Sequence, residues 1–273
     1  MTSEGKVYLI GAGPGDPKLV TLRAVEAIQD SHVIVYDYLV NPEILAHSRR
    51  NTELIYVGKR GGHKSISQSE INRVLIERAL EGQIVARLKG GDPFIFGRGG
   101  EEAEALHEAG IRWEVIPGVS SGVAAAAYAG IPLTHRQHSS SVAFITGHDA
   151  NGDKQSVDWK TAAHTADTLV IFMCAERISK IARTLVESGR DRSTPIALVR
   201  WGTYEHQEVY SGTLEDLIEQ NGFNSFMIEP PAVAIVGAVA ALAQKLSWFG
   251  SDELRFSLSD RVSDELQLVG SRA

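Results

Sequence analysis

The chain holds a single cysteine, Cys174, among its 273 residues. One thiol excludes an internal disulfide and a zinc site built only from cysteines. A long hydrophobic run is also missing, because the longest nearly uncharged stretch, Pro231–Ala243, is too short to cross a bilayer. The first residues show no basic region followed by an apolar one. We therefore expect no secretion signal and no membrane partner, and predict a cytoplasmic protein.

Basic residues are in the minority, with 27 Lys and Arg against 34 Asp and Glu, a formal net charge of -7. A duplex nucleic-acid partner normally requires a basic face, so this partner class is disfavoured. A small anionic substrate is still compatible where arginines gather in a pocket. The 43% of hydrophobic residues is typical of a globular protein, and the length suffices for one large domain or two modest ones.

Short apolar runs alternate with helical patterns in both halves of the chain. Ser67-Gln-Ser-Glu70 is a capping box that predicts the start of a helix ending near Glu81. The alternation predicts an α/β fold of two α/β domains with mainly parallel sheets. We place the boundary near Pro132–Arg136, with an N-terminal domain at 1–133, a C-terminal domain at 134–249 and a disordered polar tail at 250–273. The runs predicted as strands are 6–11, 32–36, 54–57, 84–88, 113–116, 141–146, 168–173, 196–201 and 232–236.

A glycine-rich turn, Gly11–Asp16, follows the first predicted strand. Such a turn lets the backbone approach a ligand closely, although a purely structural turn would look the same. The dinucleotide fingerprint requires a third glycine where this chain has Asp16, and Pro14 removes a backbone donor that a pyrophosphate would use. The turn therefore argues against a nicotinamide cofactor.

A second loop, within Arg87–Glu102, contains five glycines and lies between a predicted strand and a predicted helix. Ligands of open parallel sheets bind at the carboxyl ends of strands, where this loop lies. Asp92 can accept a hydrogen bond from a ribose hydroxyl or an amino group, and Arg98 can hold a carboxylate with its forked donors. Glu101 falls in the first turn of the helix, where the helix dipole favours its charged form.

Two further loops carry polar side chains. In Pro117–Ser121, Ser120 is suited to cap the next helix and also to contact a ligand. Thr134–Arg136 brings basic residues to the expected domain junction, which suits an anionic ligand. The spacing of His135 and His138 has no carboxylate or cysteine partner typical of a metal site, so we expect no metal.

Taken together, these segments resemble the uroporphyrinogen-III C-methyltransferase family of the tetrapyrrole methyltransferases. The resemblance covers residues 5–249, and Leu88–Glu102 is its most specific part. It implies two α/β domains with S-adenosyl-L-methionine (SAM) bound in the cleft between them, usually in a homodimer. The other matching stretches are Gly11–Asp16, Thr21–Ala24, Val35–Asp37, Val57–Arg60, Gln68–Asn72, Ala127–Arg136, Thr146–His148, Thr168–Val170, Gly202–Thr203 and Pro231–Ala232.

The resemblance also implies roles for particular residues. Asp37 and Lys59 match positions with acid–base roles, although Lys59 alone would look like an ordinary surface lysine. Arg98, Glu101 and Arg136 match residues that hold the tetrapyrrole or remove its proton. Met173 matches a position that contacts both substrates, although alone it would suggest a core methionine. The residues implied to contact SAM are Pro14, Gly90, Gly91, Asp92, Ile95, Ser120, Ser121, Met173, Gly202, Pro231 and Ala232.

The implied reaction transfers methyl groups from SAM to C-2 and C-7 of uroporphyrinogen III. It gives precorrin-2 through precorrin-1, releases S-adenosyl-L-homocysteine, and serves sirohaem or cobalamin biosynthesis. Arginine forks suit a macrocycle with eight carboxylates, and either Glu101 or Asp37 is suited to take the proton that the methylated ring releases. A later precorrin or cobalt-precorrin methyltransferase is the main alternative, and a non-catalytic tetrapyrrole-binding protein is another.

Overall fold

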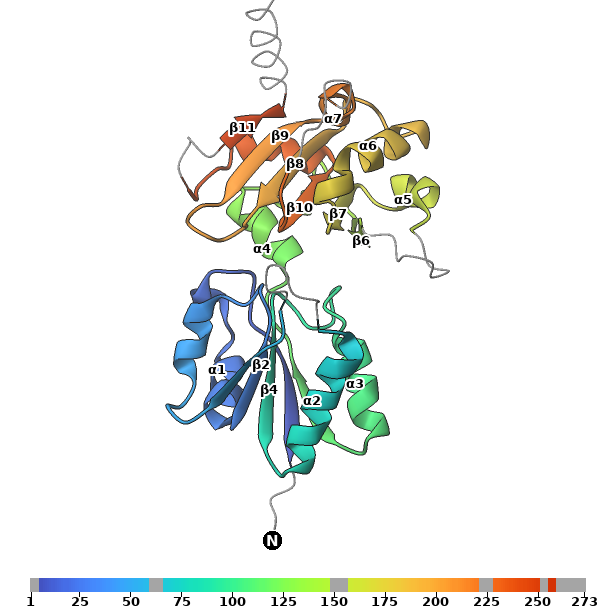
Figure 1. Ribbon diagram of the computed structural model, residues 1–273. Coiled ribbons are helices and arrows are strands. Elements are labelled where there is room, and N and C mark those ends of the chain that lie inside the picture. Colours follow the sequence, from blue (N-terminus) through green and yellow to red (C-terminus); the bar gives the residue numbers. More distant parts are fainter. Residues whose placement is uncertain (1–4, 59–65, 148–156, 221–227, 251–254, 259–273) are drawn as a thin grey trace, which may run out of the picture. The chain divides into compact units, whose positions relative to one another are not determined.

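The computed structural model describes residues 5–58, 66–147, 157–220, 228–250 and 255–258. The chain divides into two compact units, Met1–Ser121 and Gly122–Ala273. The first unit contains a five-stranded sheet and the second a six-stranded sheet, each with helices packed on it (Figure 1). The predicted α/β fold with two sheets is therefore confirmed.

The sheet of the first unit is parallel throughout, as its sequence pattern predicts. The carboxyl ends of its strands therefore lie along one edge of the sheet. The connections that follow β4 and β1 run in opposite directions, and open parallel sheets bind ligands at such a point. The strands lie in the order β3-β2-β4-β1-β5 and comprise β1 (Lys6–Gly11), β2 (Val33–Tyr36), β3 (Glu53–Tyr56), β4 (Ile84–Lys89) and β5 (Arg112–Ile116).

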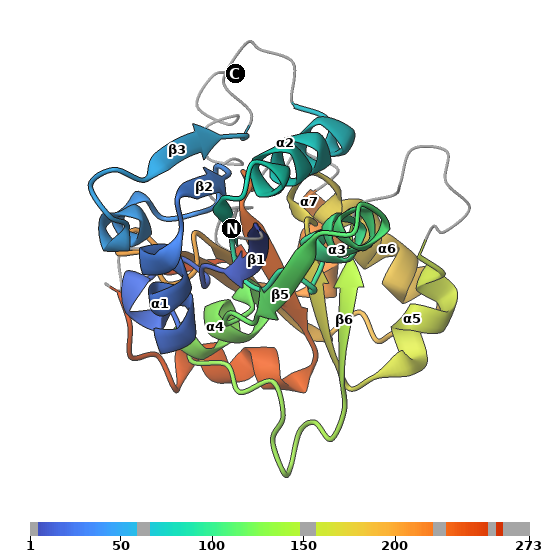
Figure 2. The same cartoon turned by 90° about the horizontal axis from the view of Figure 1, so that it is seen from below.

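Helices cover both faces of this sheet (Figures 1 and 2). Helix α1 (Leu22–Asp30) packs on one face, while α2 (Gln68–Leu80) and α3 (Gly99–Glu108) pack on the other. The capping box predicted at the start of α2 is confirmed, since the Ser67 hydroxyl accepts from the Glu70 N–H at 3.2 Å and the Glu70 carboxylate accepts from the Ser67 N–H at 2.8 Å. The central strands β4 and β1 therefore have an apolar core on each face of the sheet.

The sheet of the second unit is mixed. Only the pairs β6–β7 and β9–β11 are parallel, while β10 runs antiparallel to both of its neighbours and β8 runs antiparallel to β9. Mainly parallel pairing therefore holds for the first sheet and does not hold for the second. Residues 201–207, which join β8 to β9, are too few for the crossover that a parallel pair needs. In the order β11-β9-β8-β10-β7-β6, the strands are β6 (Val142–Thr146), β7 (Thr168–Phe172), β8 (Pro195–Arg200), β9 (Glu208–Thr213), β10 (Ala232–Val236) and β11 (Arg255–Ser257).

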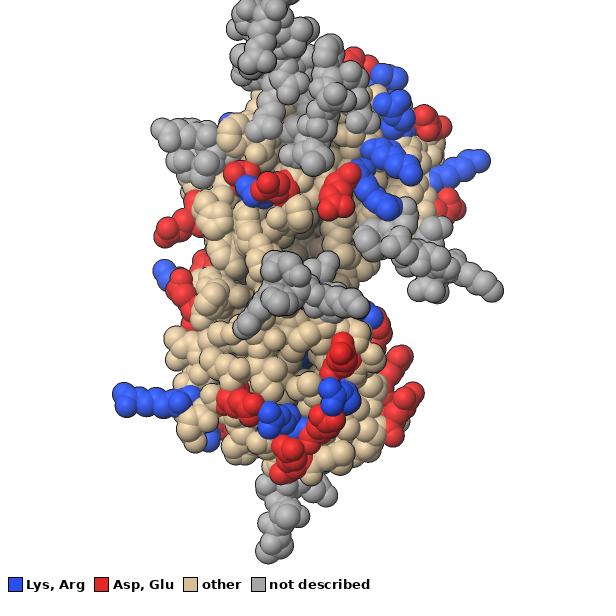
Figure 3. All heavy atoms as spheres, viewed as in Figure 1, with Lys and Arg blue, Asp and Glu red and all other residues tan. Residues whose placement is uncertain are grey.

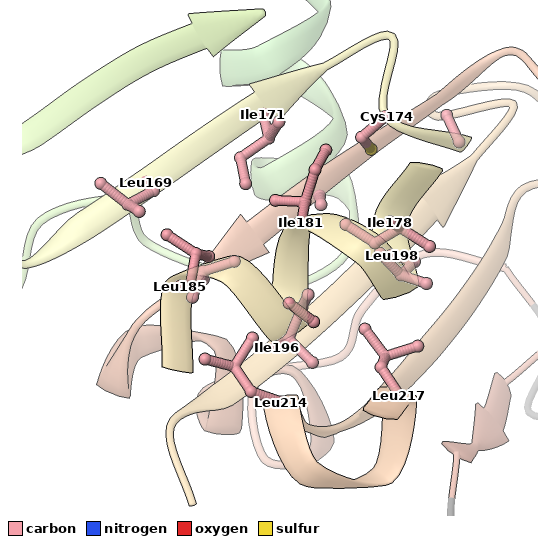
Figure 4. Close-up of a cluster of buried hydrophobic side chains, with 14 of the residues drawn as sticks. Leu169, Ile171, Cys174, Ile178, Ile181, Leu185, Ile196, Leu198, Leu214 and Leu217 are labelled. Carbon is pink, nitrogen blue, oxygen red and sulfur yellow. The ribbon is translucent and has the colours of Figure 1, made fainter. Parts of the chain in front are cut away.

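The second sheet also has an apolar layer on each face. Helices α5 (Trp159–Thr165), α6 (Ile178–Glu187) and α7 (Leu214–Gln220) cover one face, and Figure 4 shows Ile181 and Leu185 of α6 in this core. Helix α4 (Ser121–Tyr128) places Ala125 and Ala126 on the other face. The two compact units divide after Ser121, the first residue of α4, whereas the sequence pattern placed a domain boundary near Pro132–Arg136.

The end of the chain contributes to the second core. The segment from residue 250 was expected to be a disordered tail, but β11 pairs with β9 and Leu258 is fully buried. A Cβ atom on Gly212 of β9 would lie 2.7 Å from the Cβ atom of Leu258, so the fit is close. The described part of this segment is therefore an edge strand with its own core residue.

Replacing Leu258 with alanine should lower the free energy of unfolding by about 2 kcal/mol, because a buried leucine is lost at the edge of the core. Urea denaturation measures this change. Leu246→Ala is the matched control, since Leu246 is already 43% exposed and its loss should change stability by less than about 1 kcal/mol. Equal effects of the two substitutions would contradict the assignment of Leu258 to the core.

Acidic and basic side chains lie interspersed on the face of the first unit shown in Figure 3. Several form exposed ion pairs, such as Arg73 with Glu77 at 2.9 Å. Exposed pairs of this kind stabilise a fold little. Among the described residues, no helix is long and apolar enough to span a membrane.

Candidate active site

Three loops of the first unit meet at the carboxyl edge of its sheet. The loops after β1 and β4 are joined by two backbone hydrogen bonds, from the Gly13 N–H to the Gly91 carbonyl at 3.2 Å and from the Gly91 N–H to the Gly13 carbonyl at 2.7 Å. A Cβ atom on Gly11 would lie 2.4 Å from the Gly118 nitrogen, and one on Gly118 would lie 2.3 Å from the Gly91 oxygen. Only glycine permits this approach. The three loops therefore pack backbone against backbone at this edge of the sheet.

Asp92 ties two of these loops together. One carboxylate oxygen accepts from the Phe94 N–H at 2.8 Å, and the other accepts from the Gly118 N–H at 3.1 Å. An ionised carboxylate offers about four acceptor sites. Asp92 therefore fixes the loops and still has lone pairs for a ligand hydroxyl or amino group.

A buried ion network lies under this edge of the sheet. The Oε1 atom of Glu102, on α3, accepts from Nε of Arg87 at 3.1 Å, from Nζ of Lys89 at 2.9 Å and from the amide of Gln68 at 3.0 Å. The side chain of Glu102 is fully buried, and its Oε2 atom has no partner among the described residues. Two cations therefore converge on a single carboxylate oxygen.

The charge states of this network follow from burial and from its opposite charges. Burial alone would raise the pKa of Glu102, but the charges of Arg87 and Lys89 outweigh it and hold that pKa below its ordinary value. Burial, together with the neighbouring Arg87 charge, lowers the pKa of Lys89. Removing the Glu102 carboxylate, or the cations of Arg87 and Lys89, would leave an uncompensated charge in the interior.

Asp37 is the exposed end of the same network. It directly follows β2, and its Oδ2 atom accepts from the second guanidinium nitrogen of Arg87 at 3.1 Å, while Oδ1 accepts from the Leu39 N–H at 3.1 Å. Its side chain is 26% exposed, against 3% for Arg87. Arg87 thus links a carboxylate that solvent reaches to the buried Glu102.

Arg98 and Glu101 form an exposed ion pair at the start of α3. The guanidinium donates to both carboxylate oxygens, at 2.9 and 2.6 Å. These hydrogen bonds lower the pKa of Glu101 and raise that of Arg98. Arg98 therefore presents the forked geometry expected for binding a carboxylate, and its bond makes Glu101 a weaker base.

In the second unit, four predicted residues share one edge of the sheet. Met173 directly follows β7, Gly202 lies just after β8, and Pro231 and Ala232 lie where β10 begins. The Trp201 N–H donates to the Pro231 carbonyl at 3.2 Å. Met173 has a positive φ of 52° and is 53% exposed. It is therefore not a core methionine.

The model for "Tetrapyrrole (Corrin/Porphyrin) Methylases" matches residues 6–218, which includes every segment described above except β10 and the end of the chain. The chain belongs to this family.

Relatives of this tetrapyrrole methylase include curated enzymes and solved structures. The chain is 48% identical over 262 residues to a protein of Bacillus subtilis (strain 168) named "Uroporphyrinogen-III C-methyltransferase", covering 94% of this chain and 100% of the relative. It is 45% identical to a "Siroheme synthase" of Blochmanniella pennsylvanica (strain BPEN), covering 94% of this chain and only 53% of that protein. The crystal structure of a uroporphyrin-III C-methyl transferase from Thermus thermophilus "complexed with S-adenyl homocysteine" aligns with a TM-score of 0.75 and 38% identity, over 87% of this chain and all of the other.

Arg136 is the predicted site residue that this tetrapyrrole methylase does not bring to the Met173 edge. It is exposed in the turn His135–Ser139, and the Ser139 hydroxyl lies 2.8 Å from the hydroxyl of Thr168, the first residue of β7. Met173 follows the last residue of the same strand. Within the second unit, Arg136 and Met173 therefore lie at opposite edges of the sheet.

A polar cavity of about 430 Å³ also lies at the edge of Thr168, lined by His138, Asp167, Arg190 and Asp191 among others. The guanidinium of Arg190 already donates hydrogen bonds to the backbone carbonyls of Ala163, Ala166 and Asp167. The cavity contains no residue predicted for the methyl-transfer site. We assign it no part in that site.

The remaining predicted residues are distributed over the loops of the first unit. Pro14 lies in the loop after β1, Gly90 and the 36% exposed Ile95 in the loop after β4, and Ser120 and Ser121 at the start of α4. Lys59 falls outside the described residues. Among those that are described, no group of three or more His, Cys, Asp or Glu side chains is placed to hold a metal ion.

The sequence patterns did not single out the residues that support the carboxyl edge of the first sheet, which are Gln68, Arg87, Lys89 and Glu102. A signal was present, because Arg87 and Lys89 alternate with apolar residues in an otherwise hydrophobic central strand. Alternate residues of a strand share a face, so two cations on one buried face require a buried anion.

Proposed function

We propose that the chain transfers methyl groups from SAM to C-2 and C-7 of uroporphyrinogen III, giving precorrin-2 through precorrin-1. The observation that carries this proposal is the match at 48% identity over the whole length of a curated uroporphyrinogen-III C-methyltransferase. The chain spans about half the length of the siroheme synthases it matches, so we assign it the methylation and none of their further steps.

We propose methyl-donor contacts in each unit, taken by itself. In the first unit they are the backbone at Pro14, Gly90 and Gly91, the carboxylate of Asp92, the side chain of Ile95, and Ser120 and Ser121. In the second they are Met173, Gly202, Pro231 and Ala232. The fit rests on glycine backbone that approaches closely, on the spare lone pairs of Asp92, and on the outward position of Met173. SAM supplies an electrophilic methyl group on a sulfonium cation.

The acceptor needs groups that bind carboxylates and a group that takes a proton. Arg98 already binds a carboxylate in a fork, and a propionate or acetate arm of the substrate would compete with Glu101 for it. Arg136 lies at the opposite edge of the second sheet from Met173, and it keeps its proposed carboxylate-binding role on the family resemblance alone. Asp37 is our choice for the base, because the family resemblance gives its position an acid–base role and both oxygens of Glu101 already accept hydrogen bonds from Arg98. Lys59 keeps its proposed acid–base role on the family resemblance alone.

Incubation with uroporphyrinogen III and isotope-labelled SAM, followed by mass spectrometry, tests the proposal directly. We expect one and then two labelled methyl groups on the macrocycle. Label on precorrin-2 but not on uroporphyrinogen III would instead support a later precorrin methyltransferase. Family resemblance also leads us to propose a cytoplasmic homodimer, and sedimentation equilibrium of the purified protein measures its mass.

Arg98→Ala should raise the KM for uroporphyrinogen III roughly 10- to 150-fold, which corresponds to losing one or two charge-assisted hydrogen bonds. Binding of S-adenosyl-L-homocysteine, measured by calorimetry, should be unchanged. Arg73→Ala is the matched control, because Arg73 is another exposed arginine paired with a glutamate. If Arg98→Ala abolished binding of S-adenosyl-L-homocysteine and left the KM for the tetrapyrrole unchanged, the substrate role of Arg98 would be refuted.

A further inference from the structure

The loop joining β8 to β9 has an unusual backbone. Trp201 and Thr203 both have positive φ angles, 49° and 75°, on either side of Gly202. The left-handed region is unfavourable for residues with a Cβ atom and persists only where surrounding contacts enforce it. A Cβ atom on Gly202 would lie 2.6 Å from the Cβ atom of Ala125, so the loop is also pressed against α4.

The buried side chain of Gln207 forms hydrogen bonds that support this backbone conformation. Its amide oxygen accepts from the Thr203 N–H at 2.9 Å, and its amide nitrogen donates to the carbonyl of Tyr128 at 3.2 Å. Gln207 and Thr203 are each only 3% exposed. The amide thus joins the strained loop to the last residue of α4, which lies 79 positions earlier in the chain.

The backbone that Gln207 holds lies where the methyl donor is proposed to bind. Trp201 donates to the carbonyl of Pro231, so Gly202 and the start of β10 have a fixed relation. Met173 also has a positive φ, 52°. It directly follows β7, the strand beside β10, and lies at the same edge of the sheet. A shift of Thr203 towards ordinary φ values would therefore move Gly202 relative to Pro231 and Met173.

We propose that Gln207 is a positioning residue for the methyl donor: its amide holds the Trp201–Thr203 backbone in the conformation that presents Gly202 to SAM. This inference rests on the proposed function, because it takes SAM as the ligand at this edge. Gln207 touches no reacting atom. Its effect passes through the Thr203 N–H and the helix α4 to which the amide is anchored.

The loop has a second support that should keep it folded when the amide is lost. The rings of Trp201, Tyr204 and His206 pack on one another, with centroids 5.3 to 5.4 Å apart. Gln207→Met retains the length of the side chain and removes both hydrogen bonds. Gln207→Glu retains the acceptor for Thr203 but places a buried carboxylate oxygen against the Tyr128 carbonyl, so it should disturb the loop at least as much as Gln207→Met does.

Thr168→Val is the matched control. Thr168 is fully buried in the same sheet and its hydroxyl lies 2.8 Å from that of Ser139, but it sits at the opposite end of β7. Its substitution also removes one buried hydrogen bond, so it should lower the thermal midpoint comparably. It should leave unchanged the edge of the sheet where Met173, Gly202 and Pro231 are proposed to contact the methyl donor.

Calorimetric titration with S-adenosyl-L-homocysteine and steady-state kinetics test the inference on the full-length chain. We expect Gln207→Met to raise the Kd for S-adenosyl-L-homocysteine and the KM for SAM about tenfold, with kcat at saturating SAM within about threefold of the wild type. Gln207→Glu should raise both by at least as large a factor, and Thr168→Val should leave both within about twofold.

Three results separate the possible failures. Wild-type protein that does not bind S-adenosyl-L-homocysteine would overturn the proposed function itself. Wild-type protein that binds it, together with unchanged Kd values for Gln207→Met and Gln207→Glu, would overturn the role of Gln207 alone. Equal weakening of S-adenosyl-L-homocysteine binding by Thr168→Val and Gln207→Met would show that Gln207 contributes only to general stability. That result would also overturn its positioning role. If Gln207→Met does not fold, the comparison of Gln207→Glu with Thr168→Val decides in the same way.

Discussion

Glu102→Ala should lower the free energy of unfolding by about 3–5 kcal/mol, because it leaves two buried cations with one partly exposed carboxylate. Arg87 and Lys89 are only 3% and 5% exposed, and both donate to the same oxygen of Glu102. Neither side chain reaches solvent to recover the lost interaction. Urea denaturation followed by circular dichroism measures the change. Glu77→Ala is the matched control, since the exposed Arg73–Glu77 pair should contribute less than about 1 kcal/mol.

The same network predicts a dependence on pH. The pKa of Glu102 in the folded protein lies below its ordinary value of 4.5, so its contribution to stability is complete above that value and is lost as the pH falls below it. The difference in unfolding free energy between wild type and Glu102→Gln should therefore be largest at neutral pH and shrink in acid. A difference that stayed constant from pH 7 to pH 3 would contradict the assignment of a charged Glu102.

Asp37→Asn should lower kcat for methylation of uroporphyrinogen III by roughly 10²- to 10⁴-fold, the usual effect of removing a general base. The amide is nearly isosteric with the carboxylate and Arg87 keeps its bond to Glu102, so the fold should persist. Binding of S-adenosyl-L-homocysteine should not change. Single-turnover assays with labelled SAM measure the rate, and thermal unfolding verifies the fold.

Glu101→Gln is the comparison that decides which carboxylate takes the proton. We expect it to lower kcat less than Asp37→Asn does, since both carboxylate oxygens of Glu101 already accept hydrogen bonds from Arg98. A larger loss for Glu101→Gln would transfer the role of base to Glu101. Comparable losses would indicate that the two carboxylates act together.

Local patterns predicted the elements that depend on neighbouring residues. The five strands of the first sheet, four strands of the second and the capping box of α2 are visible in the sequence, because hydrophobic runs and caps are set within a few positions. Helices α5 and α7 and strands β9 and β11 were not predicted. Helices α5 and α7 have only seven residues each, and β9 and β11 are recognised as strands only once a partner strand is known.

Sequence alone also predicted the loops that we propose carry the site. The glycines of the turns after β1 and β4, together with Asp92, Arg98 and Glu101, were identified from composition and position, because glycine and charge in a strand-to-helix loop have few structural uses. Only the tertiary structure decided which charges face one another. Arg87 meets Glu102 and Asp37 across three elements, and Gln207 reaches Tyr128 across 79 positions. A residue's partner at such separations is set by how sheets and helices pack, and no local pattern contains that information.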